Sequence, residues 1–480
     1  MKHATFYERN APDASVVAAS LEGAKFAPYW LDAAASSGLK VRRPRLQGHR
    51  STDLVVVGGG FTGLWTAVLA KRRDPGRRVI LLEGRRVGWA ASGRNGGWVD
   101  ASITHGPYNG RTRWPDEYPT LERLGYENLD AMERDIQELG IQCDWERVGA
   151  LSLALEPHQV EWAKEAADSP GQTYLDHAET VARINAPGAL AAVAVTGRDV
   201  ATVDPAKLAY GLAEAAERLG VEIFERSPVR RLERAVDGGV IAVTKHGAVA
   251  ASHAALATNV FPSLIKRNRF MTVPVYDYVL MSAPLTAEQR ALIGWEGREG
   301  LGDMANQFHY SQITKDGRIL WGGYDAVYKP GGRIKAEYED DPAIHAKLAS
   351  HFFALFPQLI DTGLTFTHRW AGVIDTSTRF AAFYGTAKRG RVAYAAGFTG
   401  LGVATVRFAA EVMLDLLSGE ETERTQLEMV RHKGIPFPPE PAATIGIQLS
   451  RWSMDRADHN EGRRNLFLRT MDAVGLGFDS

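Results

Sequence analysis

Leu54-Val55-Val56-Val57-Gly58-Gly59-Gly60-Phe61-Thr62-Gly63 is the stretch of this sequence that decides its fold. Residues 54–57 form a short apolar run rich in valine, which is typical of a strand buried on both faces of a parallel sheet. The remainder fits the pattern Gly-x-Gly-x-x-Gly at Gly58, Gly60 and Gly63. Such glycines allow a tight turn, close approach of the backbone to a pyrophosphate, and close packing of the next helix on the strand. Alone, the pattern is a weak sign of a dinucleotide site, because structural turns are also rich in glycine.

The residues that follow complete a β-α-β unit. Residues 64–73 are predicted to form a helix, and residues 78–82 form the next strand. Glu83 ends that strand, where an acidic side chain can accept hydrogen bonds from a ribose diol and repels a 2′-phosphate. The N-terminus of the helix also points its partial positive charge at the phosphates. This context favours a dinucleotide site over a purely structural turn.

A second loop of small residues separates the two common dinucleotide cofactors. Residues 87–98 read VGWAASGRNGGW, and a nicotinamide enzyme rarely needs such a loop at this place. FAD extends further, and its isoalloxazine ring is met by closely approaching backbone, which glycines in this loop supply. Arg94 can favour the anionic reduced flavin electrostatically. The sequence therefore predicts FAD.

The composition excludes other classes of protein. The chain has 480 residues, which suggests two domains or one large composite domain. Its formal net charge is −1, whereas a nucleic-acid-binding protein normally has a basic surplus. No apolar run is long enough for a membrane span, and the first residues are charged where a signal peptide is apolar. Cys143 is the single cysteine, so we expect no intrachain disulfide, no metal site, and a reduced, cytoplasmic protein.

Four segments, in this order along the chain, give a more specific indication. They are 55–64 (VVVGGGFTGL), 91–97 (ASGRNGG), 256–259 (LATN) and 397–402 (GFTGLG). With them the sequence resembles the D-amino-acid-oxidase-like (DAO) superfamily of FAD-dependent oxidoreductases, and within it the gamma-glutamylputrescine oxidase-like branch. This resemblance is specific for fold and cofactor, whereas one fold hosts many substrates.

The resemblance implies an α/β fold, the glutathione-reductase-2-like or DAO fold. A composite Rossmann-like FAD-binding domain is combined in it with a substrate domain built on a large antiparallel sheet. We expect an N-terminal arm over 1–49, an FAD-binding domain from 50–107, 200–265 and 366–420, a substrate domain from 108–199 and 266–365, and a C-terminal tail with a helix over 421–480.

The resemblance also assigns positions to the cofactor. The ADP half is bound by Gly58, Gly60, Phe61, Thr62, Gly63, Glu83 and Gly84, with the backbone of Val229 at the adenine and Thr258 in the third segment. The ring is lined by Ser92, Arg94, Asn95, Gly96 and Gly97, and its pyrimidine end is contacted by Gly397, Thr399, Gly400, Leu401 and Gly402. A helix that begins at this last turn also stabilises charge at the flavin N1–O2 locus.

Two features depart from the family. Some relatives attach FAD through a cysteine in the C-terminal third or a histidine near the second glycine loop, but Cys143 lies in a predicted helical region and loop 89–97 lacks histidine. We therefore expect non-covalent FAD. Sarcosine-oxidase-like relatives place a lysine over the flavin to assist dioxygen activation, and Trp321 falls at the comparable position here. The electron acceptor is accordingly left open between dioxygen and another acceptor.

Aromatic residues of the predicted sheet are the candidates for the substrate site. Tyr276 and Tyr278 alternate on one strand and so share a face. The other candidates are His309, Tyr310, Trp321, Tyr324 and, as an acid or base after the flavin loop, His105. Packing within the sheet, or a local hydrogen bond for His105, is the competing interpretation. Arg369 and Arg379 are candidates for holding a carboxylate, with a salt bridge or solvation as the alternative.

These observations predict oxidation of the C–N bond of a small amine or amino acid. Hydride transfer to flavin N5 gives an imine that hydrolyses in water, and the protein positions the carbon and excludes solvent. A flavin monooxygenase using NADPH is one alternative, although the sequence has no second Gly-x-Gly-x-x-Gly for it. A non-catalytic flavoprotein is the other.

Overall fold

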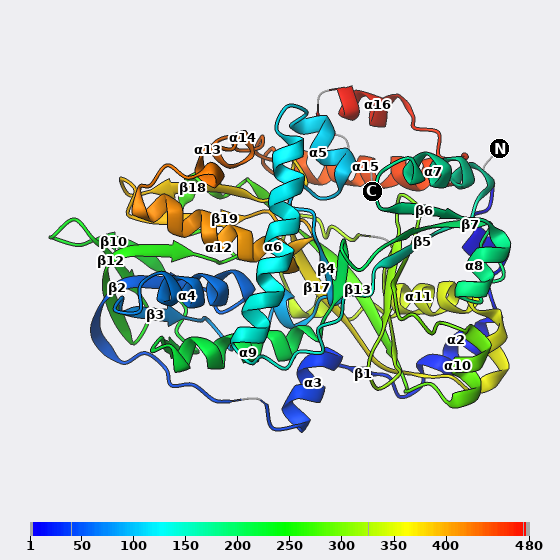
Figure 1. The fold of residues 1–480 in the computed structure, drawn as a ribbon, viewed down its shortest axis with the longest axis horizontal. Helices are drawn as coiled ribbons and strands as arrows, with labels where there is room; N and C mark the ends of the chain where they lie inside the picture. Colours follow the sequence, from blue (N-terminus) through cyan, green and yellow to red (C-terminus); the bar gives the residue numbers. More distant parts are fainter. Residues whose placement is uncertain (1–2, 40, 325, 474, 477–480) are drawn as a thin grey trace.

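Two large sheets organise the protein in the computed structural model, which describes residues 3–39, 41–324, 326–473 and 475–476 (Figure 1). The eight-stranded sheet has the order β10-β11-β12-β2-β3-β9, with β19 beside β12 and β18 beside β19. Its strands are β2 (Gly48–Val57), β3 (Val79–Leu82), β9 (Glu222–Phe224), β10 (Arg231–Arg234), β11 (Val240–Val243), β12 (Gly247–Leu256), β18 (Phe383–Ala387) and β19 (Val392–Ala396). Strands β9, β3, β2, β12 and β19 run parallel, as in a Rossmann-like domain.

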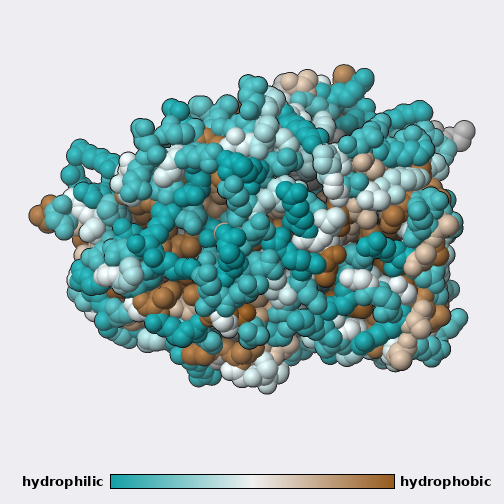
Figure 2. Space-filling model, viewed as in Figure 1, coloured by the Kyte–Doolittle hydropathy of each residue, from teal (hydrophilic) through white to brown (hydrophobic). Residues whose placement is uncertain are grey.

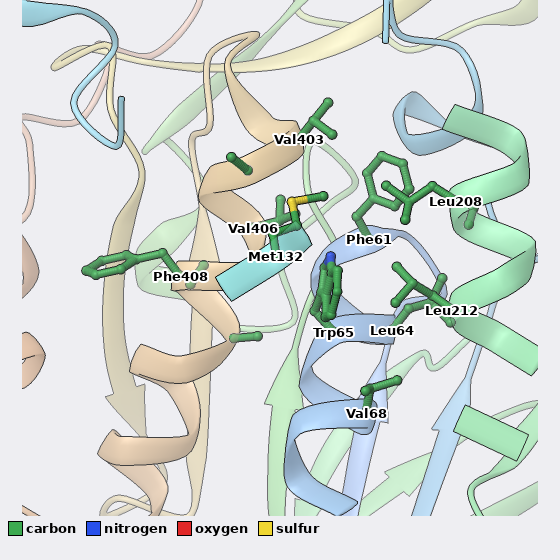
Figure 3. Packing of buried hydrophobic residues seen from close by; sticks show 14 of the residues in the cluster. Phe61, Leu64, Trp65, Val68, Met132, Leu208, Leu212, Val403, Val406 and Phe408 are labelled. Carbon is green, nitrogen blue, oxygen red and sulfur yellow. The ribbon is translucent and has the colours of Figure 1, made fainter. Parts of the chain in front are cut away.

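The buried strands of this sheet are apolar on both faces. Helices cover one of these faces, and a second core lies against the other. Leu54 and Val56 pack toward the helices, and Val55 and Val57 pack on the opposite side. The helices are α4 (Phe61–Arg73), α6 (Tyr118–Glu138), α9 (Pro205–Arg218) and α12 (Gly402–Ser418). Figure 3 shows Phe61, Leu64 and Trp65 of α4 lying between Leu208 and Leu212 of α9 on one side and Val403 and Val406 of α12 on the other.

The second sheet has nine strands in the order β1-β17-β13-β16-β15-β14-β5-β7-β6. They are β1 (Lys25–Phe26), β5 (Ala150–Ala154), β6 (Gln172–Leu175), β7 (Ala191–Val195), β13 (Thr272–Ser282), β14 (Gly300–Asp303), β15 (His309–Ile313), β16 (Ile319–Gly323) and β17 (Phe366–Ser377). One face packs on α11 (Pro342–Leu355) in a core of its own, and the other contributes Val279, Leu320 and Trp370 to the core of the first sheet's helices. This second face is the one that meets the cofactor loops.

Shorter elements surround the two sheets. They are α1 (Phe6–Arg9), α2 (Ala14–Leu21), α3 (Tyr29–Ser36), η1 (Ala91–Gly93), β4 (Trp98–Asp100), α5 (Pro107–Arg113), α7 (Pro157–Ala167), α8 (His177–Arg183), β8 (Val200–Thr202), η2 (Lys266–Asn268), α10 (Ala287–Ile293), η3 (Ala336–Tyr338), η4 (Pro357–Thr362), α13 (Glu423–Gln426), α14 (Glu428–Arg431), α15 (Ala442–Asp458) and α16 (Leu466–Ala473). The face of the molecule seen in Figure 2 is largely hydrophilic. Across the described residues, no helix has both the length and the apolar character that crossing a bilayer requires.

The structure corrects two expected domain assignments and one expected secondary-structure assignment. β17, placed by sequence at the start of the last FAD segment, pairs with β13 over its length and belongs to the nine-stranded sheet. α6, assigned to the substrate domain, packs in the core of α4 and α12. Cys143 is not helical and lies after the end of α6. It is buried, and burial raises the pKa of its thiol to about 12. Its thiol therefore packs as a small apolar group.

A buried ion pair ties α12 to α6, and its loss is expected to destabilise the protein. Arg407 Nη2 lies 2.7 Å from Asp135 Oδ2, and both side chains are buried. Arg407→Met removes one of two arginine partners of Asp135, since Arg72 also pairs with it, and should lower the free energy of unfolding by about 2 kcal/mol, as loss of a charged hydrogen bond implies. Arg123→Ala is the control, because Arg123 is exposed and pairs with Glu127 one turn away, and it should cost under about 0.5 kcal/mol. Chemical denaturation followed by circular dichroism measures both, and equal midpoints for the two variants would contradict the expectation.

Candidate active site

The turn between β2 and α4 is so tight that two of its positions require glycine. Gly58 has a φ of +115°, and a Cβ there would lie 2.2 Å from the carbonyl oxygen of Ala257, just after β12. At Gly63 a Cβ would lie 1.9 Å from the carbonyl oxygen of Gly58. The first turn of α4 therefore sits directly on the strand ends, as binding of a pyrophosphate requires.

Glu83 directs its carboxylate back to this turn. Oε2 accepts the N–H of Gly59 and Oε1 accepts that of Arg85, both at 2.6 Å. Burial raises the pKa of Glu83, and the two N–H groups counteract that rise. The segment that leads to Val229 is adjacent, since Ser227 donates its N–H to the carbonyl oxygen of Glu83 at 2.8 Å. The predicted ribose and adenine positions thus come together at one edge of the sheet.

Two helix N-termini at the site are buried, and their own N-cap residues do not cap them. The N-cap residue of α4 is Gly60 and that of α12 is Leu401, and neither caps through a side chain. The first turns are buried, with Thr62 8% and Val403 7% exposed. Uncapped N–H groups carry partial positive charge and suit anionic ligand groups. The two N-termini therefore fit the anionic groups of FAD, while the assignment of the phosphates to α4 and of the N1–O2 edge of the ring to α12 stays a prediction.

Two tryptophans donate hydrogen bonds to the loop that is expected to line the ring. Trp30 Nε1 donates to the carbonyl oxygen of Asn95 at 3.0 Å, and Trp370 Nε1 donates to that of Arg94 at 2.9 Å. Ser92 Oγ accepts the backbone N–H of Phe61 at 2.9 Å, which joins this loop to α4. The arm residue Trp30 thus stabilises the cofactor loop directly.

Asp375 organises the other cofactor loop, a role that no sequence pattern predicted. Its Oδ2 accepts the N–H of Gly397 at 2.5 Å and its Oδ1 accepts that of Phe398 at 3.2 Å. Burial raises the pKa of this carboxyl to about 7. Thr399 follows with a φ of +54°, and its side chain donates to the carbonyl oxygen of Gly397. Asp375 sets the approach of this turn to α12.

Both loops meet the same face of the nine-stranded sheet. A Cβ at Gly96 would lie 2.3 Å from the ring of Tyr310, and Gln312 Nε2 donates to the carbonyl oxygen of Gly96 at 2.5 Å. A Cβ at Gly400 would lie 3.7 Å from Ile374 of β17. The face between these contacts carries Asp277, whose Oδ2 accepts a hydrogen bond from the Tyr310 hydroxyl at 2.5 Å. Asp277 alternates with Tyr276 and Tyr278 along β13, and the aromatic pattern of that strand did not single it out.

Five of the candidates lie on the opposite face, which corrects their expected placement; Tyr324 is one of them, since it stacks on His309 against the α11 core. Tyr276, Tyr278, His309 and Trp321 are at most 1% exposed and pack in the α11 core. Tyr278 donates its hydroxyl to the carbonyl oxygen of Tyr338, and His309 Nδ1 lies 2.6 Å from Asp303. Alternation predicted correctly that the tyrosines share a face, but packing against α11 decides which face it is. On β16, Leu320 and Gly322 therefore face the cofactor loops, and no lysine stands in that strand.

The remaining polar candidates are engaged elsewhere. Arg369 forms an ion pair with Asp340 at 2.9 Å. Arg379 is buried, with its guanidinium donating to backbone carbonyl groups that include that of His432. Arg94 pairs with Glu339 at 2.5 Å. His105 lies by the ring of Phe380, and burial lowers its pKa to about 4, so it stays neutral at pH 7.

Three further predicted residues flank the site. Gly84 lies where a Cβ would be 3.6 Å from Pro228, next to Val229. Thr258 precedes Asn259, which lines a hollow together with Trp89 and Arg94. Their contacts with the cofactor stay predictions. Among the described residues, no group of three His, Cys, Asp or Glu side chains is placed to hold a metal ion.

Comparison with known proteins gives one consistent result. Residues 53–416 match the family model described as FAD dependent oxidoreductase, DAO. The chain is 27% identical to the probable oxidoreductase OrdL of Haemophilus influenzae, covering 79% of this chain and 85% of that protein. It is 28% identical to the gamma-glutamylputrescine oxidoreductase of Escherichia coli, covering 80% and 88%. Among solved structures, glycine oxidase from Geobacillus kaustophilus gives a TM-score of 0.64 at 21% identity over 80% of this chain and all (100%) of that one, and L-proline dehydrogenase from P. horikoshii gives 0.63 at 17% over 79% and 96%.

Gly58→Ala is expected to abolish retention of FAD by the purified protein. The added Cβ clashes with the carbonyl oxygen of Ala257 and forces α4 away from the strand ends. Gly446→Ala in α15 is the matched control, because nothing lies within 4 Å of a Cβ there. The FAD-to-protein absorbance ratio measures the effect, and a fully loaded Gly58→Ala protein would contradict this role of the turn.

Asp375→Asn is expected to weaken FAD binding about tenfold. The amide keeps one acceptor oxygen but cannot accept both N–H groups of the 397–398 turn, and one such hydrogen bond contributes roughly 1.5 kcal/mol. Asp361→Asn is the control, since Asp361 is an exposed residue of η4. Titration of the apoproteins with FAD, followed by fluorescence, compares the affinities; identical affinities would show that Asp375 does not set the loop.

Proposed function

Because the chain belongs to the DAO family of FAD-dependent oxidoreductases, we propose that it oxidises the C–N bond of a small amine or amino acid. The proposal rests on one observation above all. The loop at Gly96 and the turn at Gly400 that leads into α12 meet one face of the nine-stranded sheet, which can hold a small molecule against a flat cofactor ring. The relatives named gamma-glutamylputrescine oxidoreductase and glycine oxidase support this reaction class.

When bound, FAD supplies a two-electron acceptor for hydride from the carbon next to nitrogen. The chain's own residues hold and orient the reactants. The turn at Gly58 and the carboxylate of Glu83 hold the ADP half, and the backbone at Gly96 and the N-terminus of α12 hold the ring. The sheet face positions the substrate carbon and excludes water, as a hydride transfer requires. The imine product hydrolyses in water.

The electron acceptor is dioxygen or another oxidant. β13, β15 and β16 contain no lysine, so the group that assists dioxygen in sarcosine-oxidase-like relatives has no counterpart in these strands. Reoxidation is therefore measured with both kinds of acceptor.

Anaerobic reduction tests the proposal. The FAD-loaded protein is mixed with primary amines, N-methylamines, amino acids or NADPH, and the visible flavin absorbance is followed. We expect bleaching by one of the amines or amino acids and none by NADPH. Aerobic turnover is then assayed in parallel by hydrogen peroxide formation and by dye reduction. Bleaching by NADPH alone would favour a monooxygenase, and no bleaching by any donor would favour a non-catalytic flavoprotein; either result rejects the proposal.

A further inference from the structure

Building on the proposed amine oxidation, we propose that Asp277 binds the substrate's ammonium group and takes a proton from it. Tyr310 holds the Asp277 side chain in place. The substrate is then an alkylamine whose reacting carbon carries no carboxylate.

Asp277 lies between the two cofactor loops on the sheet. It is opposite Gly372 of β17 in the β13–β17 ladder, and a Cβ at Gly372 would lie 3.9 Å from Cβ of Arg94 in the ring-lining loop. Two positions along, Val275 is opposite Ile374, which contacts Gly400 in the other loop. A group bound at Asp277 is therefore held where both loops approach the sheet.

The carboxylate of Asp277 has neutral partners only. The Tyr310 hydroxyl donates to it from β15 at 2.5 Å, and the backbone N–H of Gly323 donates from β16. Along the described chain no arginine, lysine or histidine forms an ion pair with it, and the nearby Arg94 is already paired with Glu339. Burial raises its pKa to about 6, so it is ionised at pH 7. A carboxylate in this position gains most from a cationic ligand.

Two glycines lie near Asp277 on the neighbouring strands, and one of them leaves space beside it. Gly372 is the neighbour on β17, and its Cβ would make an ordinary contact with Arg94, so a side chain would fit there. Gly322 on β16 lies against the ring of Tyr310, where a Cβ would be 2.7 Å from the ring. Room next to the carboxylate is therefore left at Gly372, whereas the space over Gly322 is filled by Tyr310.

Among the described residues, the three arginines named above as candidates are already engaged with other partners. Arg94, Arg369 and Arg379 each bind Glu339, Asp340 or backbone carbonyl groups. An α-amino acid needs a cation for its carboxylate as well as an anion for its ammonium group. An alkylamine needs the anion alone, which is what this face provides.

The proton step is balanced within the site. An N–H bond of the ammonium group breaks, the proton moves to an oxygen of Asp277, and the electron pair stays on nitrogen. The neutral amine then gives hydride from its adjacent carbon to FAD. The proton on Asp277 leaves to solvent before the next cycle.

Binding of an unreactive amine tests this role without turnover. The tert-butylammonium ion has no hydrogen on the carbon next to nitrogen, so it cannot be oxidised. Its affinity for the FAD-loaded protein is measured from perturbation of the flavin spectrum and by calorimetry. We expect Asp277→Asn to weaken binding about thirtyfold and Tyr310→Phe about fivefold, as loss of a charged and of a neutral hydrogen bond implies. Asp361→Asn, exposed in η4, is the control and should bind as the wild type does.

The pH dependence separates a bound charge from a structural effect. Wild-type affinity should fall as pH drops through about 6, because protonated Asp277 no longer attracts the cation. Asp277→Asn should bind equally weakly across that range. Unchanged FAD content and melting temperature would verify that the variant is folded.

Two outcomes overturn the assignment. One is a wild type that does not bind tert-butylammonium, and the other is an Asp277→Asn protein that binds it as tightly. Failure of the proposed function looks different, since no oxidisable amine would then bleach the flavin even if the ion binds through Asp277. If a bleaching substrate proves to be an α-amino acid and alkylamines are inert, the substrate class inferred here is wrong.

Discussion

The contact between Gly58 and the end of β12 is the constraint on which the rest of the site depends. The N–H of Gly58 donates to the carbonyl oxygen of Leu82 at 2.9 Å, and the N–H of Ala257 donates to that of Val57 at 2.8 Å. The ends of the neighbouring strands β2 and β3, and of β12 from a later part of the sequence, thus meet around one residue without a side chain. Any larger residue there would separate β2 from β12 and move α4, and with α4 the N–H groups of its first turn. The predicted cofactor site can lie at this edge of the sheet because the ends of β2, β3 and β12 lie so close together.

Local sequence was enough to predict the glycine turn between β2 and α4. The fold class, the DAO family and FAD as cofactor are confirmed, and each rested on short segments whose geometry is set within about ten to thirty residues. α9 is also set by local residues, since Asp204 caps the helix that Pro205 begins. Glycine turns and helix caps can be predicted in this way because their conformation is decided by neighbours along the chain.

The substrate face could not be predicted to the same extent. Alternation along β13 placed Tyr276 and Tyr278 on one side and Asp277 on the other, but only the packing of α11 determines which side meets the cofactor loops. Composition favoured the face with the tyrosines as the substrate face. That prediction was wrong, because the tyrosines pack on α11. Of the sheet aromatics, Tyr310 does lie on the cofactor side, because β15 pairs with β16 in a register that sequence does not reveal. The membership of β17 in the nine-stranded sheet is another property of long-range pairing.

The buried carboxylates of the site differ in a way that bears on function. Glu83 and Asp375 each accept two backbone N–H groups of a glycine-containing turn, so their oxygens are used to fix the chain. Asp277 accepts from a single backbone N–H and from a tyrosine hydroxyl, neither of which depends on it for the shape of a loop. Keeping an acid at this place costs desolvation free energy that the fold does not recover through a cation of its own. An ammonium group supplied from outside would recover it, which is why Asp277 marks the substrate side of the molecule whereas the other two acids mark the cofactor side.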